Sequence, residues 1–179
     1  MKLEDDVIQL RPFTLDDVPA LVAALDGDED VARWTRIPSP YTEGDAREFI
    51  TGTSERAFAV CDAATGDLIG GIGARQYDED VVEVGYWVRA DRRGQGVAPR
   101  ALRLVTRWAI EELGAGRVQL ITAPDNVGSR RVAEKVGFRR EGMLRSFVLI
   151  KGTRRDALMY SLLPDDLEGP PRATTRFRA

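Results

Sequence analysis

The chain contains no histidine among its 179 residues and a single cysteine, Cys61. Without an imidazole base, the serine and cysteine hydrolase triads that depend on histidine are excluded. A zinc site is not expected, because histidine and cysteine are its usual ligands, and one cysteine cannot form an internal disulfide. Any proton transfer must therefore use a carboxylate, a hydroxyl, a lysine, the thiol or water.

A long apolar run and an excess of positive charge are also missing. No segment approaches the roughly 20 apolar residues that span a bilayer, and the N-terminal MKLEDDVIQLRPF is acidic where a secretory signal is basic and then apolar. The formal net charge is −3, which gives the chain no electrostatic footprint for nucleic acid. We therefore expect a cytoplasmic protein that partners neither a membrane nor a nucleic acid.

Length and hydrophobic patterning predict one mixed α/β domain. The chain is long enough for one substantial core and too short for two, so we place a single domain over residues 1–163 and a mobile, polar tail over 164–179. Capping pairs, glycines and apolar periodicity predict helices over 14–25, 42–50, 98–113 and 126–136. Strands are expected over 57–62, 68–74, 81–88 and 118–123, before a C-terminal hairpin around MLRSFVLI and DALMYSLL.

The segment RADRRGQGVAP joins the strand at 81–88 to the next helix and contains Gly94 and Gly96. A helix N-terminus presents unpaired N–H groups, and glycines let the backbone approach a pyrophosphate. One alternative is a tight turn whose glycines only serve geometry. Another is a dinucleotide-binding fold, but Pro99 stands where G-x-G-x-x-G/A needs a small residue, and the loop follows a meander instead of a first strand.

The wider sequence, EVGYWVRADRRGQGVA followed later by DNVGSRRVAEKVGF, resembles the GNAT superfamily of acetyltransferases. More narrowly it is similar to the RimJ/RimL branch, which includes enzymes that acetylate the N-termini of ribosomal proteins. The resemblance covers nearly the whole chain. It implies the GNAT fold, a central, mostly antiparallel mixed sheet with a V-shaped opening and flanking helices. It also implies that acetyl-CoA is the co-substrate, that no metal is needed and that the acceptor is an amine. A homodimer is compatible with the resemblance.

The resemblance implies a cofactor site at the glycine segment. The family's coenzyme A loop is matched by Arg93, Gly94, Gln95, Gly96, Val97 and Ala98, and the backbone amides from Gly94 onward are expected to bind the pyrophosphate. Backbone groups of Trp87 and Val88 are expected to pair with the pantetheine arm, and Asn126 matches a residue that contacts the cofactor. Pro99 departs from the family, where a hydroxyl residue is frequent, so one phosphate contact is missing. Among the helix arginines, only Arg100 is expected near a phosphate, while Arg103 and Arg107 form a solvated face with Glu111.

The resemblance also implies catalytic and acceptor residues. Glu83 is the candidate general base, with a solvent-facing strand residue as the alternative. Ser129 is either only a residue of the first helical turn or, by resemblance, the proton donor to the coenzyme A thiolate, because many GNAT enzymes have a tyrosine where this chain has Ala133. Trp34, in a stretch that we expect to be a loop, is the candidate acceptor-binding residue, with packing as the alternative. Tyr160 is expected in the core.

These residues predict direct acetyl transfer in a ternary complex, without a covalent acyl-enzyme. Glu83 would assist deprotonation of the amine, and a backbone N–H near Val88 would polarise the acetyl carbonyl. The acceptor is either a protein N-terminal α-amine, which loses its proton more easily than a lysine side chain, or a small-molecule amine. The alternative function is a non-catalytic acetyl-CoA-binding or regulatory module, which Ala133 and Pro99 keep open.

Overall fold

The computed structural model describes residues 3–52 and 56–167, and an eight-stranded sheet forms its centre. The strand order is β1-β2-β3-β4-β5-β6-β8-β7. The strands are β1 (Leu3–Glu4), β2 (Ile8–Pro12), β3 (Ala57–Asp62), β4 (Leu68–Asp78), β5 (Val81–Val88), β6 (Arg117–Thr122), β7 (Arg139–Ile150) and β8 (Thr153–Leu162). Neighbouring strands are antiparallel except β5 and β6, which are parallel. This mixed, mostly antiparallel sheet confirms the predicted fold class.

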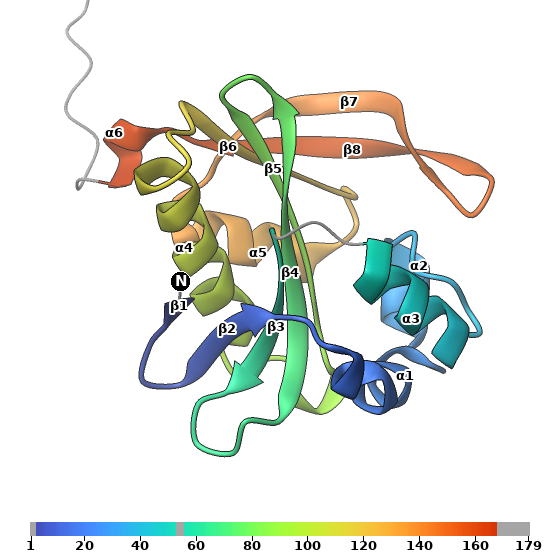
Figure 1. Cartoon of the computed structure of the whole chain (residues 1–179). Helices are drawn as coiled ribbons and strands as arrows, with labels where there is room; N and C mark the ends of the chain where they lie inside the picture. Colours follow the sequence, from blue (N-terminus) through green and yellow to red (C-terminus); the bar gives the residue numbers. More distant parts are fainter. Residues whose placement is uncertain (1–2, 53–55, 168–179) are drawn as a thin grey trace, which may run out of the picture.

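Helices cover both faces of the sheet (Figure 1). They are α1 (Val18–Leu25), α2 (Glu29–Trp34), α3 (Glu43–Gly52), α4 (Val97–Glu111), α5 (Val127–Val136) and α6 (Pro164–Leu167), with 3-10 turns η1 (Leu15–Asp17) and η2 (Ala90–Arg92). The fully buried Leu102 and Val105 of α4 pack with Val84 of β5 in one core cluster. On the opposite face, Leu21 of α1 and Ala46 of α3 form a second cluster into which Trp87 of β5 packs.

Local capping explains why the predicted helices start where they do. The Thr14 N–H donates to the Asp17 carboxylate at 2.8 Å before α1, and the Thr42 N–H donates to Asp45 at 2.8 Å before α3. The last predicted helix ends at Gly137, whose φ of 102° is the left-handed conformation that glycine adopts without strain. These helices agree with the sequence-based expectation.

Two short helices were not expected. Asp28 caps α2 by accepting the Val31 N–H at 3.0 Å, so Trp34 ends a helix and does not lie in a loop. Helix α6 falls within the predicted tail, where the Leu163 N–H donates to Asp166 at 3.0 Å. The remainder of that predicted tail, residues 168–179, lies outside the described residues. None of the described helices is long and apolar enough to cross a membrane.

Candidate active site

An opening in the sheet separates β5 from β6. The two strands pair only over Val81–Glu83 and Arg117–Gln119, whereas β5 continues to Val88 with β4 on its other side. From Val84 onward, the β6 side of β5 therefore has no strand partner within the described chain. This unpaired edge is the V-shaped opening that the resemblance implied.

The register of β5 decides which backbone groups face the opening. The Arg89 N–H donates to the Ile69 carbonyl of β4 at 2.9 Å. Residues two apart in an antiparallel ladder direct their N–H and C=O groups to the same side, so the Trp87 groups lie on the β4 side, and those of Tyr86 and Val88 face the opening. The expectation for Val88 agrees with this geometry, but that for Trp87 is wrong, because its backbone is used within the sheet.

The glycine loop lies where β5 and η2 lead into α4. Gly94 and Gly96 have φ values of 76° and 82°, and Gly96 is the N-cap of α4. The N–H groups of Val97 and Ala98, in the first turn of α4, have no earlier helical carbonyl to bond. Pro99 follows them in the same turn and is buried, so the proline has a packing role.

A surface pocket of about 500 Å³ adjoins this loop, and three cationic side chains line it. Arg100 donates to both Asp5 and Asp6 at 2.8 Å, so two carboxylates already balance its charge. Arg103 of α4 and Lys135 of α5 have no ion pair in the described part of the chain, and both line the pocket. Arg100, the expected phosphate neighbour, also lines the pocket, but Arg103 and Lys135 are the two lining cations whose charge no described carboxylate pairs with. Arg107 pairs with Glu111 at 3.6 Å, as expected.

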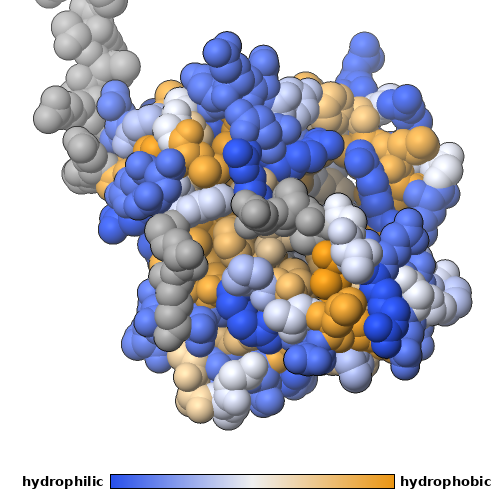
Figure 2. Space-filling view, in the orientation of Figure 1, coloured by the Kyte–Doolittle hydropathy of each residue, from blue (hydrophilic) through white to orange (hydrophobic). Residues whose placement is uncertain are grey.

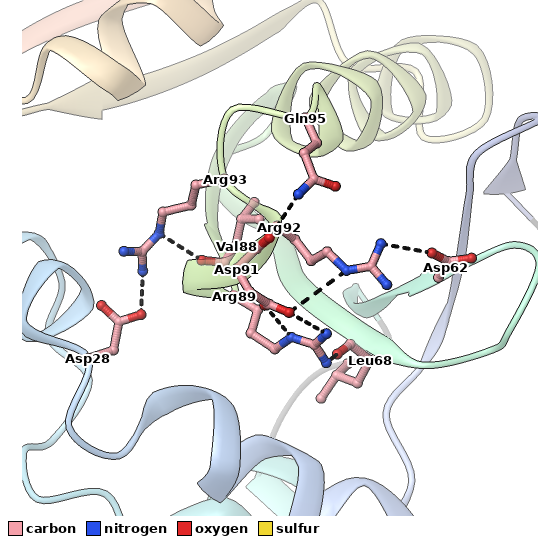
Figure 3. Close-up of polar contacts among 9 residues, drawn as sticks. All are labelled: Asp28, Asp62, Leu68, Val88, Arg89, Asp91, Arg92, Arg93 and Gln95. Atoms are coloured by element: carbon pink, nitrogen blue, oxygen red, sulfur yellow. Dashed lines mark hydrogen bonds and ion pairs between the residues drawn. The ribbon is translucent and has the colours of Figure 1, made fainter.

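Side-chain contacts hold the loop in place (Figure 3). Arg89 donates to Asp91 at 2.6 and 2.9 Å and to the Leu68 carbonyl at 3.0 Å. Arg92 donates to Asp62 at 3.0 Å. The Gln95 amide donates to the Asp91 carbonyl at 2.8 Å, so the side chain of Gln95 belongs to the loop, and its backbone is what remains for a ligand.

Arg93 connects the glycine loop to α2. Its guanidinium forms an ion pair with Asp28, and its Nε donates to the Val88 carbonyl at 3.0 Å (Figure 3). A second ion pair joins the guanidinium to Asp30 at 2.9 Å. The Arg93 side chain is therefore engaged within the protein, leaving only its backbone for the expected cofactor contact. It also occupies the Val88 carbonyl, so the Val88 N–H is the group left to face the opening.

Glu83 lies at the apex of the opening, as the last β5 residue paired with β6. Its side chain is only 16% exposed and bonds Arg75 at 2.7 Å, with Gln119 donating to its other oxygen at 3.4 Å. The alternative of a solvent-facing strand residue is therefore wrong. Glu83 shares a sheet face with Trp87, since alternate residues point the same way, and that face carries α1 and α3.

Ser129 meets β5 from the other face, and Asn126 caps the helix that carries it. The Asn126 side chain accepts the Ser129 N–H at 3.0 Å, which confirms its capping role. The Ser129 Oγ lies 3.0 Å from the Tyr86 hydroxyl, and burial raises the pKa of Tyr86 to about 12. Sequence reasoning missed Tyr86, because alternation along the strand separates it from Glu83 and Trp87 but no sequence signal shows that its hydroxyl meets Ser129.

Trp34 lies near contacts that join α2 to two other segments. The Arg33 guanidinium stacks 4.4 Å from the centre of the Trp34 ring and contacts Asp125 at 3.4 Å. Arg155 of β8 donates to the Arg33 carbonyl at 3.4 Å. These contacts connect α2 with the start of α5 and with the β7–β8 hairpin. Tyr160 is fully buried, as expected for a core residue.

Comparison with known proteins places this arrangement in context. The family model described as "Acetyltransferase (GNAT) domain" matches residues 8–139. "Putative ribosomal N-acetyltransferase YdaF" of Bacillus subtilis (strain 168) is 36% identical over 106 residues, 58% of this chain and 58% of that protein. "Probable N-acetyltransferase YjcK" of the same organism is 30% identical over 178 residues, covering 92% of this chain and 98% of YjcK.

Solved structures show the same architecture. A GNAT-family acetyltransferase from Bacillus anthracis aligns with a TM-score of 0.84 and 25% identity, covering 91% of this chain and 98% of that one. Mycobacterium smegmatis RimJ in complex with CoA-disulfide aligns with a TM-score of 0.79 and 22% identity, covering 90% and 84%, a likeness of fold. Residues 8–139, which the family model matches, include both strands that border the opening and the glycine loop.

Proposed function

Because the chain belongs to the GNAT family of acetyltransferases and is an N-acetyltransferase, we propose that it transfers acetyl from acetyl-CoA directly to a primary amine in a ternary complex. The observation that carries this proposal is the unpaired edge of β5 beside the glycine loop at the start of α4. A loop with free N–H groups suits a pyrophosphate, and a free strand edge suits the amides of a pantetheine arm. Acetyl-CoA carries both groups in one molecule.

The loop and the strand edge together define how acetyl-CoA is placed. The backbone of Gly94 to Ala98 binds the pyrophosphate, and Arg103 and Lys135 bind the 3′-phosphate in the adjoining pocket. The pantetheine arm then follows β5 from Val88 toward Tyr86. A strand rises about 3.3 Å per residue, so Glu83 and Val88 lie about 16 Å apart along β5. The acetyl group therefore lies nearer Tyr86, where Glu83 can act through water.

The chemistry is divided between the two faces of the sheet. On the face of α1 and α3, Glu83 accepts the proton of the attacking amine through water. A backbone N–H of Tyr86 or Val88 polarises the acetyl carbonyl. On the α5 face, Ser129 donates a proton to the departing thiolate. Cys61 takes no part: it is buried on β3, and burial raises the pKa of its thiol, opposite to what a nucleophile needs.

We assign a protein N-terminal amine as the acceptor. Two observations support this choice. The relative YdaF is named as a putative ribosomal N-acetyltransferase. In this chain, β7 exposes the apolar side chains of Met143, Phe147 and Leu149. Figure 2 shows apolar surface over the β7–β8 hairpin, near a hollow in this face of the molecule. An exposed apolar surface beside an active site suits a peptide better than a small polar amine. The carboxylates of Asp28 and Asp30 are engaged by Arg93 and are not offered to a cationic acceptor.

A thiol-release assay with acetyl-CoA tests this function. The acceptors are peptides with free N-termini, polyamines, aminoglycosides and amino acids, and a parallel titration measures acetyl-CoA binding. Thiol release with peptides supports the proposal. Thiol release only with another class of amine would mean that this class, and not a protein N-terminus, is the acceptor. Acetyl-CoA binding without release from any acceptor would favour the non-catalytic module. Absence of acetyl-CoA binding would overturn the cofactor placement.

A further inference from the structure

Two hydroxyl groups from distant parts of the sequence meet beside the opening. Tyr86 projects from β5 into the core cluster beneath α4 and α5, and Ser129 lies in the first turn of α5. Their oxygens are 3.0 Å apart, a good distance for an O–H···O hydrogen bond. The Ser129 carbonyl is the other partner within reach of the Tyr86 hydroxyl, at the longer distance of 3.4 Å.

The number of protons in this pair restricts the direction of the bond. Each hydroxyl has one proton to donate, and the raised pKa of Tyr86 keeps its proton in place at neutral pH. If Tyr86 donates to the Ser129 oxygen, the serine proton is free to point elsewhere. If Ser129 donates to Tyr86, the serine proton is consumed inside the pair. Only the first direction leaves Ser129 able to protonate a leaving group.

We propose that Tyr86 is a positioning residue that acts through Ser129, fixing the serine oxygen and directing its O–H toward the coenzyme A thiolate. This inference rests on the proposed acetyl transfer. As the serine O–H bond breaks and the S–H bond forms, negative charge develops on the Ser129 oxygen, and the Tyr86 O–H donates to it. Water then returns a proton to Ser129, and the hydroxide that remains takes the proton that Glu83 received from the amine, so the cycle ends with the amide and the free thiol. A hydrogen bond to a charged oxygen is stronger than one to a neutral oxygen, so Tyr86 stabilises the transition state more than the ground state.

A double-mutant cycle tests this coupling. Tyr86→Phe removes the hydroxyl and keeps the ring in the core. We expect it to lower kcat about tenfold, the effect of one hydrogen bond, with the KM for acetyl-CoA unchanged. Ser129→Ala should lower kcat by about 100-fold, in the range of general acid catalysis. In the Ser129→Ala background, Tyr86→Phe should cost nothing further, because its partner is gone.

Tyr160→Phe is the matched control. Tyr160 of β8 is a buried tyrosine whose hydroxyl donates at 3.1 Å to Glu134 of α5, the helix that also carries Ser129. Within the described part of the chain, the Tyr160 hydroxyl makes no hydrogen bond to Ser129 itself. Its loss should reduce stability and leave kcat unchanged. Equal kcat for wild type and Tyr86→Phe, or multiplicative effects in the double mutant, would overturn the inference while leaving acetyl transfer intact. Wild-type protein that turns over no acceptor would overturn the proposed function, and this inference with it.

Discussion

Glu83 and Tyr86 lie on the same strand, β5, and their side chains point to opposite faces of the sheet. Glu83 reaches Arg75 and Gln119 on the face of α1 and α3, while Tyr86 reaches Ser129 of α5. Successive side chains of a strand point to alternate faces, so two residues three positions apart lie on opposite faces. The opening between β5 and β6 therefore has a carboxylate on one side and two hydroxyls on the other, which suits an acceptor that enters from one face and a thiolate that leaves toward the other.

Glu83→Gln tests the carboxylate. The amide keeps the size of the side chain but cannot accept a proton from the amine, so we expect kcat at neutral pH to fall about 100-fold, the lower end for general base catalysis. Binding of acetyl-CoA should be unchanged. Steady-state kinetics across pH and a binding titration measure the two effects. Glu79→Gln, an exposed acid in the turn before β5, is the control. If turnover of Glu83→Gln matched wild type at every pH, Glu83 would have no part in catalysis.

Arg103 and Lys135 are expected to recognise the 3′-phosphate of acetyl-CoA. Replacing either residue by alanine should weaken acetyl-CoA binding about five- to tenfold, because each contributes one charge-assisted contact at an exposed site. Neither substitution should affect binding of acetyl-dephospho-CoA, which lacks that phosphate. Calorimetric titration of both ligands measures the difference. Arg107→Ala, on the same helix but paired with Glu111, should bind both ligands as wild type does. Equal losses for both ligands would place the two cations elsewhere on the cofactor.

Much of the fold is predictable from local patterns. Thr14 with Asp17, and Asn126 with Gly137, specify helix ends through neighbouring residues, and these ends are confirmed. The GNAT family is likewise confirmed by the family match and by YjcK. Helix α2 was missed because it has only six residues, too few to show apolar periodicity, and its start depends on Asp28, which also binds Arg93.

The site was less predictable, because its details depend on contacts between distant segments. Whether the Trp87 N–H and C=O groups point toward β4 or toward the opening depends on the register between β5 and β4, which the sequence does not show. Arg100 was expected at a phosphate, but it is bound by Asp5 and Asp6, more than 90 positions earlier in the chain. Ala133 removed the usual acid, and the Tyr86–Ser129 pair appeared only when β5 and α5 were packed together.

Gly70→Ala tests the packing that supports β5. A Cβ at Gly70 would lie 2.7 Å from the Trp87 carbonyl oxygen, so the backbone of β4 or β5 must shift. We expect a loss of about 1–3 kcal/mol in the free energy of unfolding, as for other overpacked sites. Gly73→Ala, on the same strand with no atom within 4 Å of the added Cβ, should change stability by less than about 0.5 kcal/mol. Urea unfolding measures both, and equal stability of the two variants would contradict the close approach.

Glu141→Gln tests an ion pair that joins three strands. Arg117 of β6 binds both carboxylate oxygens of Glu141 on β7, at 2.6 and 2.7 Å, and Ser161 of β8 donates to it at 2.7 Å. The Arg117 and Ser161 hydrogen bonds lower the pKa of Glu141 from 4.5 to about 2. A carboxyl group with a lower pKa in the folded state stabilises the fold above its unfolded pKa and loses that contribution as pH falls through the folded value.

The urea midpoint of Glu141→Gln should therefore be lower than that of wild type at pH 7, and the difference should shrink between about pH 4.5 and pH 2. The effect will be modest, because the Glu141 side chain is 44% exposed and water screens the pair. Glu48→Gln, at an exposed position on α3, should follow wild type throughout. A midpoint difference that stayed constant down to pH 2 would mean that the glutamate acts through packing, since only the loss of its charge makes the effect depend on pH.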